Sequence, residues 1–112
     1  MVDRDLPVLD PTALVDLFGI EDRSVFCKIL SSYPIKDGPD THALADIMAN
    51  GGAPRDLAHK LKSSARAIGA QRLADLYYRI EQGNLAPSAA AAGVIEQEFS
   101  AVASAIEQYC AG

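Results

Sequence analysis

The sequence predicts an all-α fold, an antiparallel (up-and-down) four-helix bundle with short additional helices at the N-terminal side. Three observations lead to this prediction. Alanine, the strongest helix former, supplies 19 of the 112 residues. Aromatic residues make up 6% of the chain, and few segments alternate apolar and polar residues as a half-buried strand does. Apolar residues instead recur at helical spacing between short breaks that contain glycine or proline.

The first segment is polar, contains Pro7 and shows little periodicity, so residues 1–9 are expected to form a loose lead-in to one domain over residues 10–112. Asp10-Pro11 supplies an N-cap followed by proline at the first helical position. Gly19 would then end a short helix that carries Leu14, Leu17 and Phe18.

Two further helices are expected before residue 51. The first starts near Asp22 and ends at Pro34 and the turn over residues 36–39, because proline has no N–H to donate and disfavours a continuing helix. The second runs from about Thr41 to Asn50, where glycines follow. Their inward-facing residues are Val25, Phe26, Ile29, Leu30, Tyr33, Leu44, Ile47 and Met48.

Three helices should complete the bundle. Pro54 suits the first turn of a helix that extends to Ile68, and Gly69 stands where a left-handed residue closes a helix. The next spans about residues 70–82, and the last follows Ser88 with an apolar stripe at spacings of four and three. The apolar residues of these two helices are Leu73, Leu76, Tyr77, Ile80, Ile95, Phe99, Val102, Ile106 and Tyr109.

The net charge of -5 argues against nucleic acid and anionic membranes as partners, since both would be repelled. No apolar run is long enough to span a membrane, and the N-terminus lacks the features of a signal peptide. Cys27 and Cys110 stand alone in helical segments, without CxxC spacing or a nearby set of ligands. We therefore expect a cytoplasmic, monomeric protein with reduced, partly buried thiols.

A helical wheel of residues 54–68 separates a core side from a basic side. The core side would hold Leu57, Leu61, Ser64 and Ile68. Opposite lie His59 and Arg66, with Arg55, Lys62 and Ser63 close by, which predicts a solvent-facing strip. An exposed imidazole is a nitrogen nucleophile near neutral pH, and a lysine one turn on can neutralise a transferred phosphoryl group.

The run from His59 to Ala70, followed by Leu73, resembles the signature of histidine phosphotransfer (HPt) domains, H-x-L-K-G-S-x-x-x-x-G-A-x-x-L. The one departure is Ser63, which stands where the family usually has glycine. The resemblance implies a phosphorelay intermediate without a kinase activity or ATP site of its own. It would take a phosphoryl group from the aspartyl phosphate of a response-regulator receiver domain and pass it to another receiver.

Carried over by position, the resemblance makes His59 the phosphoacceptor and Lys62 the residue that stabilises the phosphoryl oxygens. Ser63 would hold the small-residue position that lets a receiver approach. From the basic strip of the helical wheel, Arg66 is added as a supporting residue and Arg55 as a docking candidate. A hybrid histidine kinase is a further candidate partner. The Mg²⁺ ion would come from the receiver, and no cofactor of the chain's own is expected.

A hairpin that turns at Gly69-Ala70 places Ile80 or Glu81 across from His59, and Glu81 is the polar one. Its carboxylate could accept a hydrogen bond from the imidazole, or it could be an ordinary surface glutamate paired with Arg66 or Arg79. Tyr78 lies off the apolar stripe and is either a docking residue or an exposed aromatic.

His42 has no matching lysine and is expected to be a surface residue, and the residue pattern predicts no metal site. A different function is also open. The chain could be an HPt-like interaction module that binds receivers or kinases without carrying phosphate, for which Ser63 is the sequence hint. Retention of both His59 and Lys62 favours the phosphocarrier.

Overall fold

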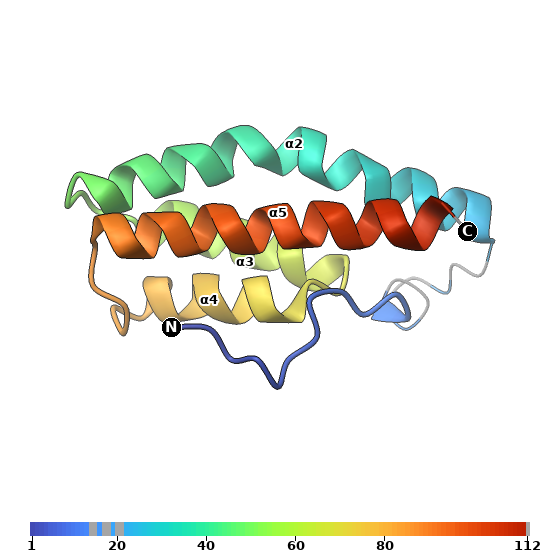
Figure 1. Ribbon diagram of the computed structural model, residues 1–112, viewed down its shortest axis with the longest axis horizontal. Helices are drawn as coiled ribbons and strands as arrows, with labels where there is room; N and C mark the ends of the chain where they lie inside the picture. The colour runs from blue at the N-terminus through green and yellow to red at the C-terminus, as the bar shows by residue number, and fades with distance from the viewer. Residues whose placement is uncertain (14–15, 17–18, 20–21, 112) are drawn as a thin grey trace.

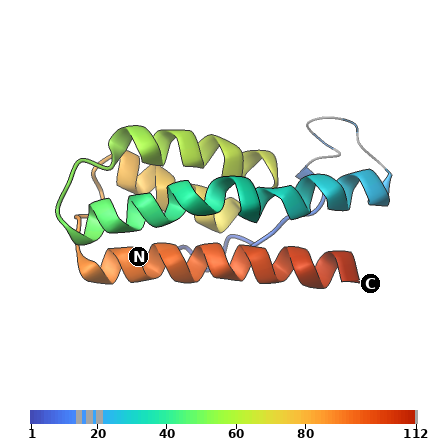
Figure 2. The same ribbon diagram turned by 90° about the horizontal axis from the view of Figure 1, so that it is seen from above.

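Four helices form the architecture of the described chain: α2 (Arg23–Ala49), α3 (Arg55–Ala67), α4 (Gln71–Glu81) and α5 (Ala89–Ala111). The computed structural model describes residues 1–13, 16, 19 and 22–111. The helices pack as antiparallel pairs, α2 with α5 and α3 with α4 (Figures 1 and 2). No strand occurs among the described residues, and the predicted all-α bundle is confirmed.

Helix α2 corrects the prediction of two separate helices. It continues through Pro34 and Pro39 as one helix of 27 residues. Its buried stripe passes the prolines without a break, and packing against α5 outweighs the hydrogen bonds that the prolines cannot make. The start is as predicted, because the Asp22 side chain accepts a hydrogen bond from the Ser24 amide at 2.8 Å. The predicted helix at Leu14, Leu17 and Phe18 lies outside the described residues.

The α3–α4 hairpin turns at Gly69, which has a φ of +82°. A Cβ at this position would lie 2.1 Å from the Asp10 carbonyl oxygen, so only glycine fits. The Asp10 amide in turn donates to the Gly69 carbonyl at 2.7 Å. This close contact fixes the turn that brings the two helices side by side.

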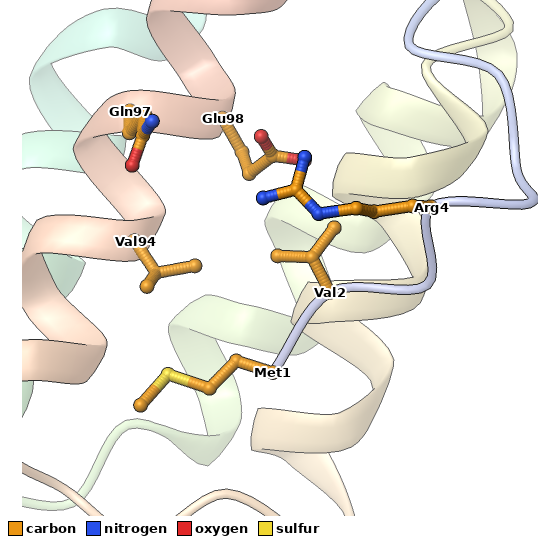
Figure 3. Close-up of a pocket in the computed structure, with 6 residues that line it drawn as sticks. All are labelled: Met1, Val2, Arg4, Val94, Gln97 and Glu98. Atoms are coloured by element: carbon orange, nitrogen blue, oxygen red, sulfur yellow. The ribbon is translucent and has the colours of Figure 1, made fainter.

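The N-terminal lead-in makes hydrogen bonds with the bundle. The Arg72 amide donates to the Pro7 carbonyl at 3.1 Å, and Arg72 Nε donates to the Leu6 carbonyl at 3.2 Å. A hollow of about 350 Å³ remains between this segment and α5. Figure 3 shows Arg4 pointing across that hollow toward Glu98.

The two cysteines are joined in a disulfide, so the prediction of reduced thiols is wrong. Cys27 lies near the start of α2 and Cys110 near the end of α5, with their Cα atoms 5.8 Å apart. The antiparallel pairing of α2 and α5 brings together two residues that are 83 positions apart in sequence. Sequence spacing carries no sign of this proximity. The Arg23 guanidinium covers the same end and lies 4.8 Å from the centre of the Tyr109 ring.

The core lies between the helix pairs and contains side chains from all four helices. Its largest fully buried residues are Tyr77, Leu30, Leu44, Met48, Leu61, Leu73, Leu76, Ile95 and Val102. Inside it the Thr41 and Tyr77 hydroxyls form a hydrogen bond of 3.0 Å between α2 and α4. None of the described helices combines the length and hydropathy that a membrane span requires.

Candidate functional site

The imidazole of His59 stands on the surface of α3, with 64% of its side chain exposed. Its Nδ1 lies 2.7 Å from Oε1 of Glu81, the last residue of α4. Of the two residues that the turn at Gly69-Ala70 predicts across from His59, Ile80 and Glu81, it is Glu81 that contacts the ring. Among the described residues, no hydrogen-bond partner is found for Nε2 of His59.

The Glu81 carboxylate is shared between two partners. Its second oxygen, Oε2, lies 2.5 Å from Nζ of Lys62. Donation from Lys62, and then from His59, holds the pKa of Glu81 below its usual range. An ionised carboxylate can only accept, so Nδ1 of His59 must carry the hydrogen in this contact. In the neutral ring this leaves the lone pair on Nε2, the nitrogen that is free to react.

Lys62 does not belong to the solvent-facing strip in which the helical wheel places it. Only 8% of Lys62 is exposed, and its ammonium lies 5.5 Å from the centre of the Tyr78 ring. The buried face of α3 is rotated toward α4, so that Ala58 and Ala65 lie fully inside, while Leu57 and Ser64 are half-buried. Small alanines let α4 approach closely, and this approach covers the stem of Lys62.

The alternative partners considered for Glu81 are not those observed. Arg79 lies 2.9 Å from Asp75 on its own helix, and Glu81 pairs with Lys62 and His59. The reading of Glu81 as a surface glutamate paired with Arg66 or Arg79 is therefore wrong. The Glu81 side chain is 10% exposed, which places it beneath the imidazole.

The remaining candidates lie on α3 and α4. Ser63, Arg55 and Arg66 are exposed, and Tyr78 is 42% exposed. The Ser63 hydroxyl lies 3.5 Å from the backbone carbonyl of His59, so it points back along the helix. Sequence patterns carry no sign of a neighbouring open hollow of about 490 Å³, which lies where the start of α3, the end of α4 and the following loop meet. It is lined by Pro54, Arg55, Ile80, Glu81, Gln82, Gly83, Leu85, Ala86 and Pro87.

The second histidine provides a comparison within the same molecule. His42 of α2 is exposed, as expected, and its Nδ1 lies 2.8 Å from Oε1 of Glu96 on α5. Both histidines are thus held by a glutamate through Nδ1. The two contacts differ in the carboxylate's second partner, because Glu81 also pairs with Lys62.

On the role that the resemblance implies for Lys62, its replacement with methionine should slow phosphoryl transfer roughly 10- to 100-fold, because no lysine charge would then offset the phosphoryl oxygens. Because Lys62 is buried, its truncation should also lower the stability of the fold. Lys62→Ala should lower the free energy of unfolding by more than the ~0.5 kcal/mol typical of an exposed position. Rates from phosphorylated receivers and urea denaturation measure the two effects.

Lys60 is the matched control, since it is exposed and pairs with Asp40 at 2.7 Å. Lys60→Met should leave the transfer rate and the stability nearly unchanged. Equal rates in Lys62→Met and the parent chain would remove Lys62 from the site.

Comparison with protein families assigns this arrangement to a known type of domain. The family model described as the Hpt domain matches residues 42–105, which is more than half of the chain. The matched segment contains the whole α3–α4 hairpin with His59, Lys62 and Glu81. Comparison with curated proteins and with solved structures yields no match. Hpt domains are phosphocarrier modules that interact with receiver domains and kinases in two-component systems. The chain therefore belongs to the Hpt domain family, the histidine phosphotransfer modules of phosphorelays.

Proposed function

We propose that this chain accepts a phosphoryl group on Nε2 of His59 from the aspartyl phosphate of a receiver domain and passes it to another receiver. The observation that carries this proposal is the state of the imidazole. Its Nδ1 is held by the Glu81 carboxylate at 2.7 Å, while 64% of the side chain is open to solvent. A nucleophile oriented by a neighbouring base in this way is suited to covalent transfer.

In the transfer step, the Nε2 lone pair attacks phosphorus and forms the N–P bond as the acyl phosphate O–P bond breaks. The receiver's aspartate leaves as a carboxylate, and the ring keeps its hydrogen on Nδ1. The ammonium of Lys62, now paired with Glu81 at 2.5 Å, is the cation that would offset charge on the phosphoryl oxygens. The reverse sequence transfers the group to the next receiver.

The Mg²⁺ ion of this reaction would belong to the receiver. Within the described ranges, no group of three or more His, Cys, Asp or Glu side chains is arranged to hold a metal ion. This chain's own contribution is the nucleophile, the carboxylate that orients it and the lysine. We propose that the chain has no ATP site or kinase activity of its own and that it takes its phosphoryl group from a partner.

The test is a relay with two receivers in the presence of Mg²⁺. One receiver carries radiolabelled aspartyl phosphate, and a second, unlabelled receiver is added after the first has been removed. We expect the label to move onto this chain as an acid-labile, alkali-stable group and then to the second receiver, whereas ATP alone should give no label.

A panel of phosphorylated receivers guards against choosing a wrong partner. Binding to a receiver without any transfer of label would support the alternative, an interaction module that carries no phosphate. It would contradict the proposed relay.

A further inference from the structure

The contact between His59 and Glu81 has a different role once the ring is phosphorylated. Before transfer, the neutral ring carries its hydrogen on Nδ1 and donates it to Glu81 at 2.7 Å. After Nε2 has bonded to phosphorus, the same hydrogen makes the ring an imidazolium. The ring can then keep this proton or lose it to water.

The two forms of the phosphorylated ring differ in reactivity. A protonated ring departs from phosphorus as neutral imidazole, whereas an unprotonated ring would have to depart as an anion. The protonated form therefore transfers its phosphoryl group more readily, and this is the basis of the acid lability of phosphohistidine. Whatever holds the proton on Nδ1 thus controls how readily the carrier gives up its phosphoryl group.

The surroundings of the ring place one anion directly at Nδ1. Glu81 of α4 is that anion, and its side chain is 10% exposed, so water screens it little. From α2, Asp40 is already paired with Lys60 at 2.7 Å. The other charged groups within one turn of His59 on α3 are Arg55, Asp56, Lys60 and Lys62. Of these, Lys62 is bound to the far oxygen of Glu81 and leaves the near oxygen to the ring.

We propose that the Glu81 carboxylate keeps the proton on Nδ1 after phosphorylation of Nε2, and so holds phosphorylated His59 in its transfer-ready form. This inference rests on the proposed function, since it assumes that His59 is the phosphorylated residue. Glu81 contacts the ring and not the phosphoryl group, which makes it a positioning residue. A neutral amide in its place could instead donate to Nδ1 and favour the unprotonated, slowly reacting ring.

The negative charge of Glu81 also repels the phosphoryl group through space. This repulsion, like the retained proton on Nδ1, promotes loss of the phosphoryl group. The Glu81 carboxylate at Nδ1 and a phosphoryl group on Nε2 would repel each other, which lowers the stability of the phosphorylated state. Lys62 moderates this repulsion because it can contact either anion. The arrangement therefore favours a carrier that passes its phosphoryl group onward and does not store it.

The experiment uses the full chain with His42→Gln, so that His59 is the single histidine. The chain is phosphorylated with phosphoramidate, a small-molecule donor that requires no receiver. The pH at which half of the Nδ1 protons are lost is then measured by ¹⁵N NMR on histidine-labelled protein. With Glu81 present, we expect this midpoint to lie at least about one pH unit higher than in Glu81→Gln. Above both midpoints, the fraction of protonated rings would then be about tenfold higher with Glu81 than in Glu81→Gln.

Three variants separate this effect from a loss of structure. Glu96→Gln removes the comparable carboxylate that faces position 42 and should leave the midpoint unchanged. Lys62→Met leaves Glu81 facing the ring and should keep the midpoint as high as in the parent chain, or raise it. The double variant with Glu81→Gln and Lys62→Met leaves no unpaired buried charge and should show the low midpoint of Glu81→Gln. Circular dichroism checks the helical content of each.

The outcomes distinguish this inference from the function on which it rests. If the Glu81→Gln midpoint equals that of the parent, or if Glu96→Gln lowers it equally, the inference is wrong while His59 remains the acceptor. If phosphoramidate and receivers both leave His59 unmodified, the proposed function itself is wrong. Phosphoryl loss at pH 8 gives a second measure, and we expect it to be about tenfold slower in Glu81→Gln than in the parent.

Discussion

Glutamine at position 59 should abolish phosphoryl acceptance, with a loss of more than about 100-fold that leaves only background label. The amide of glutamine has no nucleophilic nitrogen lone pair, whereas the imidazole presents Nε2 while Nδ1 is bound to Glu81. His59 is 64% exposed, so the substitution should cost little stability. Incubation with a labelled receiver and Mg²⁺, followed by alkaline electrophoresis, measures the remaining label.

His42→Gln is the matched control for this experiment. His42 is also bound to a glutamate through Nδ1, at 2.8 Å. Among the described residues, however, no lysine pairs with that glutamate, Glu96. We expect this variant to accept phosphate as the parent does. Label that persists in His59→Gln, or that maps to His42, would contradict the assignment of the site.

Removal of the Cys27–Cys110 disulfide should lower the free energy of unfolding by about 4 kcal/mol. The bond closes a loop across 83 positions, and a cross-link over so long a segment strongly restricts the unfolded chain. The double variant with Cys27→Ser and Cys110→Ser should therefore unfold at a clearly lower urea concentration. Urea denaturation monitored by circular dichroism, without reductant, provides the measurement.

The reduced parent chain supplies the control, since it lacks the cross-link but keeps both sulfur atoms. It should match the double variant in stability, and reductant should leave the double variant unchanged. If the oxidised and reduced parent chains unfold at the same urea concentration, the disulfide contributes no stability. Phosphoryl transfer should persist after reduction. The disulfide joins the start of α2 to the end of α5, whereas His59 lies in the first turns of α3, just after the connection from the other end of α2.

The disulfide also bears on where the protein works. A cytoplasm that keeps thiols reduced would break this bond, whereas an oxidising compartment would preserve it. In a reducing cytoplasm, the location expected from the sequence, the chain would be the reduced and less stable form. In an oxidising compartment it would keep the disulfide and be the more stable form. The comparison of oxidised and reduced protein measures that difference directly.

Sequence patterns predict the α3–α4 hairpin well because its information is local. Gly69 marks the turn, and counting from it in both directions places Ile80 or Glu81 opposite His59, of which Glu81 is the polar one. The burial of Lys62 could not be predicted in the same way. It depends on how far α3 rotates toward α4, and the two small core residues that permit this rotation, Ala58 and Ala65, give no apolar signal as strong as that of leucine.

Helix α2 and the disulfide show where local rules are insufficient. Pro34 and Pro39 are strong local signals for a break, but the buried stripe that continues past them depends on α5, which is distant in sequence. The spacing from Tyr33 to Thr41 and Leu44 fits an unbroken helix and could have shown it. Cys27 and Cys110 pair only because α2 and α5 are antiparallel and in register.

The burial of Lys62 has a consequence for the entropy of phosphoryl binding. A free lysine side chain loses about 1.5–2 kcal/mol of rotamer entropy when it is fixed in one conformation. In this protein Lys62 is already confined between Glu81 and the Tyr78 ring before any phosphoryl group arrives. Most of that loss is therefore incurred during folding and not when the ammonium exchanges one anion for another.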